Sequence, residues 1–211
     1  MSQDRQGEKH DIILEAAVRV FARGGFHNSR ISEIAEEAGV ASGTIYLYFR
    51  NKDDILISVF EESLDRIIQD VKKDLAGLDD PADKLHKFIE HHLTMLKDHK
   101  ELGEVLQVEL RQSHKFMKEY EPRHWIEYID ILAGILKEGQ KKGAFRKDLS
   151  LGIFKRAVFG ALDEIALHWV MTEKDEKWLD HAARELSTLV MDGVRPRSEA
   201  ARSGLKKVSG Q

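Results

Sequence analysis

The sequence predicts an all-α protein of about nine helices. The chain has 211 residues, of which only three are prolines and none is cysteine. Strand-like alternation of apolar and polar residues is missing. Apolar residues recur instead at the three- and four-residue spacing of amphipathic helices along most of the chain. With 42% hydrophobic residues, the chain can bury one or two ordinary cores.

Three helices are predicted at the N-terminal end, and the first two end at glycines. Gly24-Gly25 and Gly39 follow their apolar stripes, and glycine favours the left-handed backbone that closes a helix C-terminus. Residues 42–49 are predicted to form the third, short helix. The stripes of the first two helices are Ile13, Ala16, Ala17, Val20 and Phe21, then Ile31, Ile34, Ala35 and Ala38.

Six further helices are predicted over the rest of the chain. Breaks between them are indicated by Gly77, Asp80-Pro81, Glu121-Pro122 and Gly143. Asp80-Pro81 is typical of an N-cap residue followed by proline at the first helical position. Apolar periodicity places the six helices within residues 56–75, 85–96, 102–117, 125–136, 151–171 and 178–191.

The last two predicted helices are apolar on more than one face. A helix with apolar side chains nearly all round is either central in the fold or covered by a partner chain. We therefore expect a homodimer that forms through residues 151–171 and 176–192.

The charge distribution suggests three parts. The chain carries a net charge of −4, whereas residues 1–52 hold seven basic and seven acidic side chains and are neutral. Residues 194–211 are basic, contain serine and glycine, and are expected to be a mobile tail that either adds phosphate contacts or acts as a spacer. The expected division is 1–52, 53–193 and 194–211.

Composition also disfavours several classes of protein. No run of about eighteen apolar residues is present, so no membrane span is expected. The polar N-terminus lacks the apolar segment of a secretory signal, and cytoplasmic residence is the expectation. The lack of cysteine excludes disulfides and thiolate metal sites.

Signatures of an enzyme are missing as well. A di-iron bundle needs two Glu-x-x-His motifs, and residues 121–124 supply one. His91 and His92 are neighbours in sequence and point about 100° apart on a helix. No phosphate loop, nucleophile elbow or His-Glu-x-x-His motif is present. We expect no catalytic activity, no metal and no cofactor.

The third predicted helix, residues 42–49, has an unusual outer face. At about 100° per residue, Ile45 and Phe49 share the face that packs inward. The opposite face shows Gly43, Thr44 and Leu47, which suits entry into a DNA groove. Glycine permits close backbone approach, and threonine or leucine can touch base edges or a thymine methyl group.

Groups suited to phosphate contact lie around the same helix. The hydroxyls of Tyr46 and Tyr48 and the helix N-terminus can bond phosphate oxygens. Arg50 and Lys52 follow immediately and supply positive charge. Taken alone, the two tyrosines fit ordinary half-buried aromatic residues better than phosphate contacts. Together with the tight turn at Gly39, the pattern indicates a helix-turn-helix over residues 30–55.

Fixed residues at fixed spacings extend this pattern into a family resemblance. Residues 26–56 resemble the DNA-binding domain of the TetR family of bacterial repressors. That resemblance implies an all-α homodimer with three DNA-binding helices, a connecting fourth helix and a ligand-binding half. The positions that carry it are Phe26, Ser29, Ile34-Ala35, Ala38-Gly39-Val40, Gly43-Thr44-Ile45-Tyr46, Tyr48-Phe49, Lys52 and Leu56.

The resemblance also implies roles for individual residues. Phosphate contacts are expected from Ser29, Arg30, Tyr46, Tyr48 and Lys52. Groove-facing residues are expected to be Ser42, Gly43, Thr44 and Leu47. Leu47 departs from the polar residue or histidine frequent at that place in the family, so base readout there should be apolar or absent.

Three further stretches resemble the FadR-type branch of the TetR family. These are residues 43–57, residues 109–113 and the segment from Phe159-Gly160 through Asp163-Glu164 to Trp169-Val170-Met171. Members of that branch repress fatty-acid degradation and respond to long-chain acyl-CoA. The resemblance therefore implies an operator of palindromic double-stranded DNA and an acyl-CoA effector for this chain.

An acyl chain needs an apolar tunnel between helices. Each apolar candidate, taken alone, fits an ordinary core residue better than a ligand contact. For the CoA phosphates we expect Arg111, with Lys115, Arg123, Lys155 or Arg156 further out, although Arg111 is also suited to a buried pair with Asp163 or Glu109. The expected binding residues are Leu93, Leu96, Leu106, Leu110, Arg111, Trp125, Tyr128, Ile129, Leu132, Phe159, Leu162 and Asp163.

A drug-responsive efflux repressor is the alternative within the family. Its pocket would combine carboxylates with aromatic rings that attract cations. The residues that suit such a pocket are Trp125, Tyr128, Trp169, Asp163 and Glu164.

Overall fold

The structure is a computed structural model that describes residues 2–110, 123–172 and 174–196, with side chains from Gly7 onward. Within these ranges the chain forms nine α-helices and one π-helical segment, and no strand. The predicted all-α class is confirmed. None of the described helices is long and apolar enough to cross a membrane.

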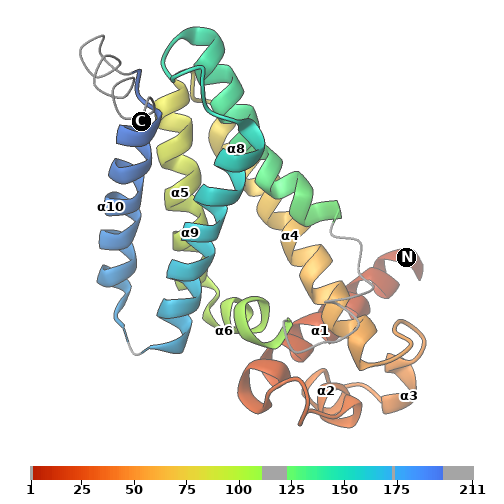
Figure 1. Ribbon diagram of the computed structural model, residues 1–211. Helices are drawn as coiled ribbons and strands as arrows, with labels where there is room; N and C mark the ends of the chain where they lie inside the picture. Colours follow the sequence, from red (N-terminus) through yellow and green to blue (C-terminus); the bar gives the residue numbers. More distant parts are fainter. Residues whose placement is uncertain (1, 111–122, 173, 197–211) are drawn as a thin grey trace, which may run out of the picture.

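Three helices form a head at one end of the molecule (Figure 1). The long first helix packs on the second, and the second on the third. Gly25 and Gly39 adopt φ angles of 76° and 66° at the first two helix ends, which confirms the predicted glycine stops. The head consists of α1 (Ser2–Gly24), α2 (Ile31–Glu37), α3 (Ser42–Ile45) and their connecting turns.

The third helix is shorter than the predicted 42–49. Regular α-helix ends at Ile45, and the chain continues as a tight turn in which the N–H groups of Leu47 and Tyr48 donate to carbonyls three residues earlier. The turn keeps Ile45 and Phe49 on the inner face, with exposed fractions of 0% and 2%. The predicted inward orientation of this pair is confirmed.

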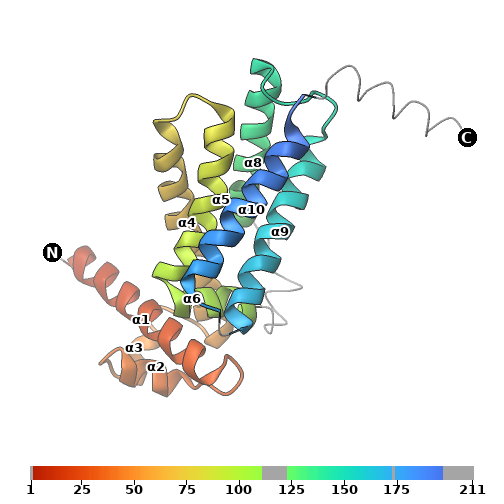
Figure 2. The ribbon, with the colours of Figure 1, turned by 90° about the vertical axis from the view of Figure 1, so that its left-hand side faces the viewer.

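A body of long helices leads away from the head, beginning with α4 (Lys52–Ala76) (Figures 1 and 2). Asn51 caps α4 through its side chain. Asp80 caps α5 just before Pro81, which confirms the cap predicted there. The remaining long helices are α5 (Pro81–Asp98), α8 (Arg123–Lys142), α9 (Leu151–Met171) and α10 (Glu176–Val194).

A short connection joins the body to α1. The predicted helix over 102–117 begins as α6 (Lys100–Glu104) and passes into the π-helical segment η1 (Val105–Glu109). Residues 111–117 of that prediction lie outside the described residues. Both α6 and η1 pack against α1. Buried apolar residues of head and body consequently form one continuous core.

Candidate functional site

The outer surface of α3 and the turn after it is unusually exposed for its composition. Leu47 is 80% exposed and Tyr46 is 60% exposed, while Ser42 and Gly43 are also at the surface. A Cβ atom added to Gly43 would meet nothing within 4 Å. An apolar side chain with this exposure suggests a surface that another molecule covers. Four of the predicted DNA-contacting residues therefore share one accessible face.

Thr44 and Tyr48 are half-buried beside this face. The Tyr48 ring lies 6.0 Å from the His10 ring and 6.3 Å from the Phe49 ring, between centroids. Tyr48 therefore contributes to packing between α1 and the α3 turn as well as to the surface.

Arg30 is exposed just before α2, where its backbone N–H donates to Glu33 at 2.8 Å. The predicted DNA contacts of Arg30, Thr44 and Tyr48 stay predictions.

Ser29 belongs to the turn between α1 and α2 and is buried, with 6% of it exposed. Its Oγ lies 2.7 Å from the carbonyl oxygen of Gly25 and 3.2 Å from that of Val20, where it can donate to either. The side chain therefore fixes the turn. Its predicted direct contact with phosphate is untested, and the burial of its hydroxyl does not favour it.

Lys52 holds the same turn from α4. Its Nζ donates to the carbonyl oxygens of Phe26, His27 and Ser29, the last two at 3.0 and 2.9 Å. The ammonium group also lies 4.6 Å from the centroid of the Phe26 ring. Burial lowers the pKa of Lys52. Because an ammonium group has three hydrogens to donate, these carbonyls occupy all of them, and the geometry gives Lys52 a positioning role.

Glu109 reaches the turn from η1. One of its carboxylate oxygens, Oε2, accepts a hydrogen bond from the backbone N–H of Phe26, and only 6% of Glu109 is exposed. The turn after α1 is thus held by Lys52 from α4 and by Glu109 from the end of the π-helical segment. From the sequence, Glu109 was expected to pair with Arg111 or to belong to the matched stretch 109–113, and not to contact this turn. A contact between residues 83 positions apart leaves no local pattern that could have indicated it.

The predicted effector-binding residues converge in the core of the body. Those on α5, η1, α8 and α9 are in mutual reach because α5 packs on α8 and α9, and α9 packs on η1. Leu106, Trp125 and Phe159 are half-buried against this core, and Asp163 is half-buried on α9. The fully packed members are Leu93, Leu96, Leu110, Tyr128, Ile129, Leu132 and Leu162, none more than 4% exposed.

The positively charged residues predicted to bind the CoA phosphates lie only partly within the described part of the chain. Arg111 and Lys115 lie outside the described residues. Arg123 and Arg156 are exposed, and a guanidinium nitrogen of Arg156 donates to the carbonyl of Gly152 at 3.2 Å. Lys155 forms an ion pair with Asp130.

An aromatic cluster within the body contains a histidine that sequence analysis did not select. The rings of Trp125 and Tyr128 lie 5.6 and 6.2 Å from the Phe159 ring, between centroids. His92 joins them at 5.8 Å from Tyr128 and 5.9 Å from Phe159. A signal was present, because His92 continues the stripe of Leu85, Phe88, Ile89, Leu93 and Leu96 at helical spacing.

His92 is buried and uncharged. Its Nδ1 lies 2.8 Å from the hydroxyl of Tyr128, and its Nε2 is enclosed without a hydrogen-bond partner. Burial is the main cause that lowers the pKa of His92 from 6.5 to about 4, with a smaller contribution from the charge of His91. Burial also raises the pKa of Tyr128.

Acidification is expected to destabilise the fold through His92. Between pH 6.5 and 4 the unfolded chain binds a proton at this residue that the folded chain does not, so stability falls as pH falls. At about 1.4 kcal/mol per pH unit, the loss approaches about 3 kcal/mol near pH 4. Urea unfolding at pH 7 and pH 4.5 measures it, and the His92→Phe variant should lose distinctly less stability. An equal loss in both proteins contradicts the assignment.

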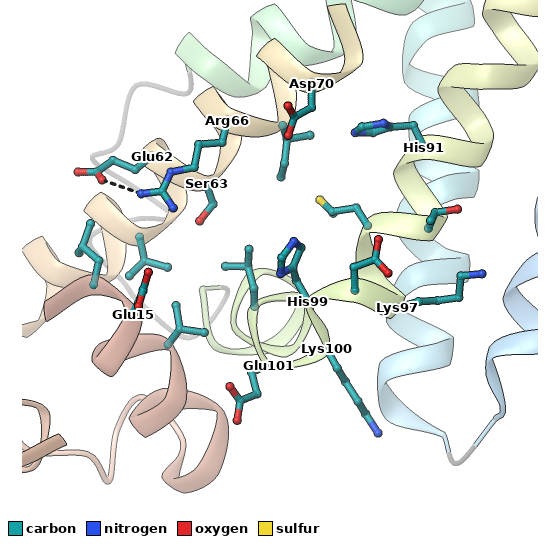
Figure 3. Close-up of a pocket in the computed structure, with 18 of the residues that line it drawn as sticks. Glu15, Glu62, Ser63, Arg66, Asp70, His91, Lys97, His99, Lys100 and Glu101 are labelled. Carbon is teal, nitrogen blue, oxygen red and sulfur yellow. Dashed lines mark ion pairs between the residues drawn. The ribbon is translucent and has the colours of Figure 1, made fainter. Parts of the chain in front are cut away.

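A cleft of about 860 Å³ lies at the junction of head and body, between α1, α4, α5 and α6 (Figure 3). Its walls are strongly charged, and Arg66 pairs with Glu62 at 3.7 Å. None of the predicted effector-binding residues that the structure describes lines it.

One group of three possible metal ligands occurs among the residues with described side chains, namely His10, Asp11 and Glu62. The guanidinium group of Arg66 already lies 3.9 Å from Asp11 and 3.7 Å from Glu62, and His10 lies 3.3 Å from Glu62. These contacts give the group the character of an ion-pair network that joins α1 to α4.

Two family descriptions match the chain. Residues 13–59 match bacterial regulatory proteins of the tetR family, and residues 60–193 match the C-terminal region of YsiA-like proteins. The first range spans most of the head and the start of α4, whereas the second spans most of the body.

Individual proteins are similar over most of the chain. A fatty acid metabolism regulator protein of Bacillus subtilis (strain 168) is 39% identical over 166 residues, which are 79% of this chain and 86% of that protein. The crystal structure of FadR from Bacillus subtilis in complex with stearoyl-CoA superposes with a TM-score of 0.81 at 37% identity, covering 87% of this chain and 98% of that one. FadR from Bacillus halodurans gives 0.83 at 36% identity, covering 90% and 97%.

Proposed function

The chain belongs to the TetR family of bacterial regulatory proteins and is a DNA-binding transcriptional repressor, and within that family we propose that it controls fatty-acid degradation genes and leaves its operator when it binds long-chain acyl-CoA. The observation that carries the proposal is the likeness to a regulator whose structure contains stearoyl-CoA, at 37% identity over 87% of this chain. We further propose that it acts without catalysing a reaction, in the cytoplasm, and without a bound cofactor.

The proposed DNA contacts follow from the accessible face of α3. Ser42, Gly43, Thr44 and Leu47 enter the groove, and Arg30, Tyr46 and Tyr48 contact phosphates. Ser29 and Lys52 act beneath them by fixing the turn that presents α2 to the DNA backbone. Because residues 1–52 have no net charge, affinity depends on a few placed donors rather than on bulk attraction.

The proposed homodimer forms through residues 151–171 and 176–192. Ile153 and Met171 on α9 and Leu189 on α10 are 71%, 65% and 71% exposed, which is unusual for large apolar side chains. A two-fold dimer presents two copies of α3 to a palindromic operator. Its heads must lie about 34–36 Å apart to reach successive major grooves.

The proposed effector site is the core around the aromatic cluster. Each buried CH₂ group of an acyl chain contributes about 0.8 kcal/mol, so a long chain supplies most of the affinity without polar contacts. The apolar side chains that would line the tunnel pack on one another in this structure. An acyl chain must therefore separate them, and the helices that carry them move apart.

Effector binding is proposed to alter head spacing through two connections. The fourth helix, α4, belongs to the body and carries Lys52 at its first turn, and η1 carries Glu109. Both side chains hold the turn after α1. Acyl-CoA can release DNA only if it binds more tightly to a conformation whose head spacing does not fit the operator. By thermodynamic linkage, bound DNA must then weaken acyl-CoA binding by the same factor.

The efflux-repressor alternative is not favoured. Its proposed cation pocket is divided in this structure, because Trp125 and Tyr128 pack on Phe159 whereas Trp169 is buried near the other end of α9. The ammonium group of Lys100 lies 5.9 Å from the Trp169 ring centroid, where a cationic drug would have to sit.

Stearoyl-CoA at low micromolar concentration is expected to raise the melting temperature of the protein and to weaken operator binding at least about tenfold. Fluorescence anisotropy with labelled operator DNA and differential scanning fluorimetry measure the two effects. Free CoA and the lipophilic cation tetraphenylphosphonium serve as controls and should do neither. Release by the cation but not by stearoyl-CoA would reverse the assignment.

A further inference from the structure

His92 occupies a position where the helix pattern calls for an apolar residue. Its neighbours on the inner face of α5 are Phe88, Ile89 and Leu96, all at most 1% exposed. A leucine or phenylalanine there would complete the core, whereas the imidazole leaves Nε2 enclosed and unpaired. A buried polar group without a hydrogen-bond partner destabilises the folded state. Packing alone therefore does not explain why a histidine occupies this position.

The hydrogen-bond partner on the other side of the ring indicates which tautomer is present. Tyr128 is the described partner of Nδ1, at 2.8 Å. If Tyr128 donates, its hydroxyl hydrogen is satisfied and the imidazole N–H lies on Nε2. In the opposite arrangement, both the tyrosine hydrogen and the Nε2 lone pair would lack partners. The first arrangement leaves fewer unpaired groups, and it makes Nε2–H a donor directed into the core.

The surroundings restrict the acceptor that this donor would meet. The rings of Tyr128 and Phe159 lie within 6 Å of the His92 ring, and Phe88 packs on Tyr128 at 5.2 Å. A neutral imidazole in such surroundings does not compensate a carboxylate, whose burial is costly. An uncharged carbonyl oxygen attached to an apolar chain fits the donor and the surroundings.

A second enclosed nitrogen lies on α8. His124 is four residues before Tyr128 and so on the same face of the helix, and its Nδ1 is also buried without a partner. Two unpaired imidazole nitrogens associated with this face mark it as a place for polar groups of a ligand whose remaining length is apolar.

We propose that Nε2–H of His92 donates a hydrogen bond to the thioester carbonyl oxygen of bound acyl-CoA, which makes His92 a specificity-determining residue inside a mainly apolar tunnel. The contact fixes how deeply the acyl chain enters, because the carbonyl must stop at the imidazole. This inference rests on the proposed function and names the polar contact within that same site.

The test compares two ligands that differ only in the carbonyl oxygen. Stearoyl-CoA carries the thioester, whereas S-octadecyl-CoA has a CH₂ group in its place. Isothermal titration of the full-length protein is expected to show about tenfold tighter binding of stearoyl-CoA, the value of one hydrogen bond between neutral groups. In His92→Phe the difference between the two ligands should fall to less than about twofold.

The matched control is His91→Gln, because His91 is adjacent in sequence but bonds Asp74 at 2.9 Å on α4. It should keep the tenfold preference. Equal discrimination by wild type and His92→Phe, or no discrimination by wild type, overturns the inference while leaving acyl-CoA as the effector. No binding of stearoyl-CoA by wild type overturns the proposed function instead.

A measurement on the unmodified chain covers the case in which His92→Phe does not fold. With ¹⁵N-labelled histidine, stearoyl-CoA should shift the His92 Nε2–H proton downfield, and S-octadecyl-CoA should not. The same response to both ligands would show that the imidazole meets water or the protein rather than the thioester.

Discussion

Replacing Gly43 with glutamate is expected to reduce operator affinity at least about a hundredfold while leaving the melting temperature unchanged or slightly higher. A Cβ atom at Gly43 meets nothing within 4 Å, so the folded chain accepts a side chain there. Glycine within a helix is also unfavourable relative to most other residues, by about 0.5–1 kcal/mol. The substitution is therefore not expected to destabilise the fold.

The loss of operator affinity is expected because position 43 lies on the surface proposed to face DNA. Gly43 lies beside Ser42 and close to Leu47 on the most exposed face of the α3 turn. A glutamate would hold this face away from the groove and place a negative charge against phosphates. Like-charge juxtaposition across an interface costs several kcal/mol, and a hundredfold loss corresponds to about 2.7 kcal/mol.

Fluorescence anisotropy at one fixed salt concentration measures the affinity, and thermal unfolding measures the stability. Gly134→Glu is the matched control, because Gly134 is exposed on α8 with equally open surroundings. It should bind operator as wild type does. If Gly43→Glu also binds like wild type, α3 is not the element that enters the groove.

The features that sequence analysis predicted correctly depend on local pattern. The turns at Gly25, Gly39 and Gly143 need positive φ, which only glycine adopts without strain, so one residue type marks each helix end. The burial of Ile45 and Phe49 follows from the four-residue spacing that places both on one face of the chain.

The features that sequence analysis did not predict arise from contacts between distant segments. Lys52 appears as a free cation in the sequence, yet carbonyls more than twenty residues earlier in the chain surround its ammonium group. Glu109 was expected to pair with Arg111 close by in the sequence, whereas the fold brings it to Phe26. His92 was discounted as a metal ligand, and its unpaired nitrogen becomes apparent only when α8 and α9 close around it.

Replacing Glu109 with leucine is expected to uncouple acyl-CoA binding from DNA release. Glu109 lies between Leu106 and Leu110, two proposed tunnel residues on and next to η1, and its carboxylate holds the N–H of Phe26 in the head. In the proposed mechanism, an acyl chain displaces those leucines, Glu109 moves with them, and the head follows through this bond. Allosteric coupling is typically about 1–3 kcal/mol. Loss of one of the two proposed connections should therefore reduce the acyl-CoA-induced drop in operator affinity at least about fivefold.

The coupling between acyl-CoA binding and operator binding can be measured in two ways. Operator affinity is determined with and without stearoyl-CoA, and stearoyl-CoA affinity is determined with and without operator, because the two ratios must be equal. Glu109→Leu should also lower stability by about 1–3 kcal/mol, since the Phe26 N–H loses its partner. Glu109→Gln retains an acceptor oxygen and should recover most of the coupling.

Glu104→Gln is the matched control, because Glu104 lies on the adjoining turn. Burial, followed by the negative charge of Glu109, raises the pKa of Glu104. Its substitution removes a carboxylate from the same region without touching the Phe26 bond, so coupling should persist. A Glu109→Leu protein that stearoyl-CoA releases from DNA as readily as wild type would show that the signal does not pass through Glu109. It would favour α4 instead, whose Lys52 also holds the turn after α1.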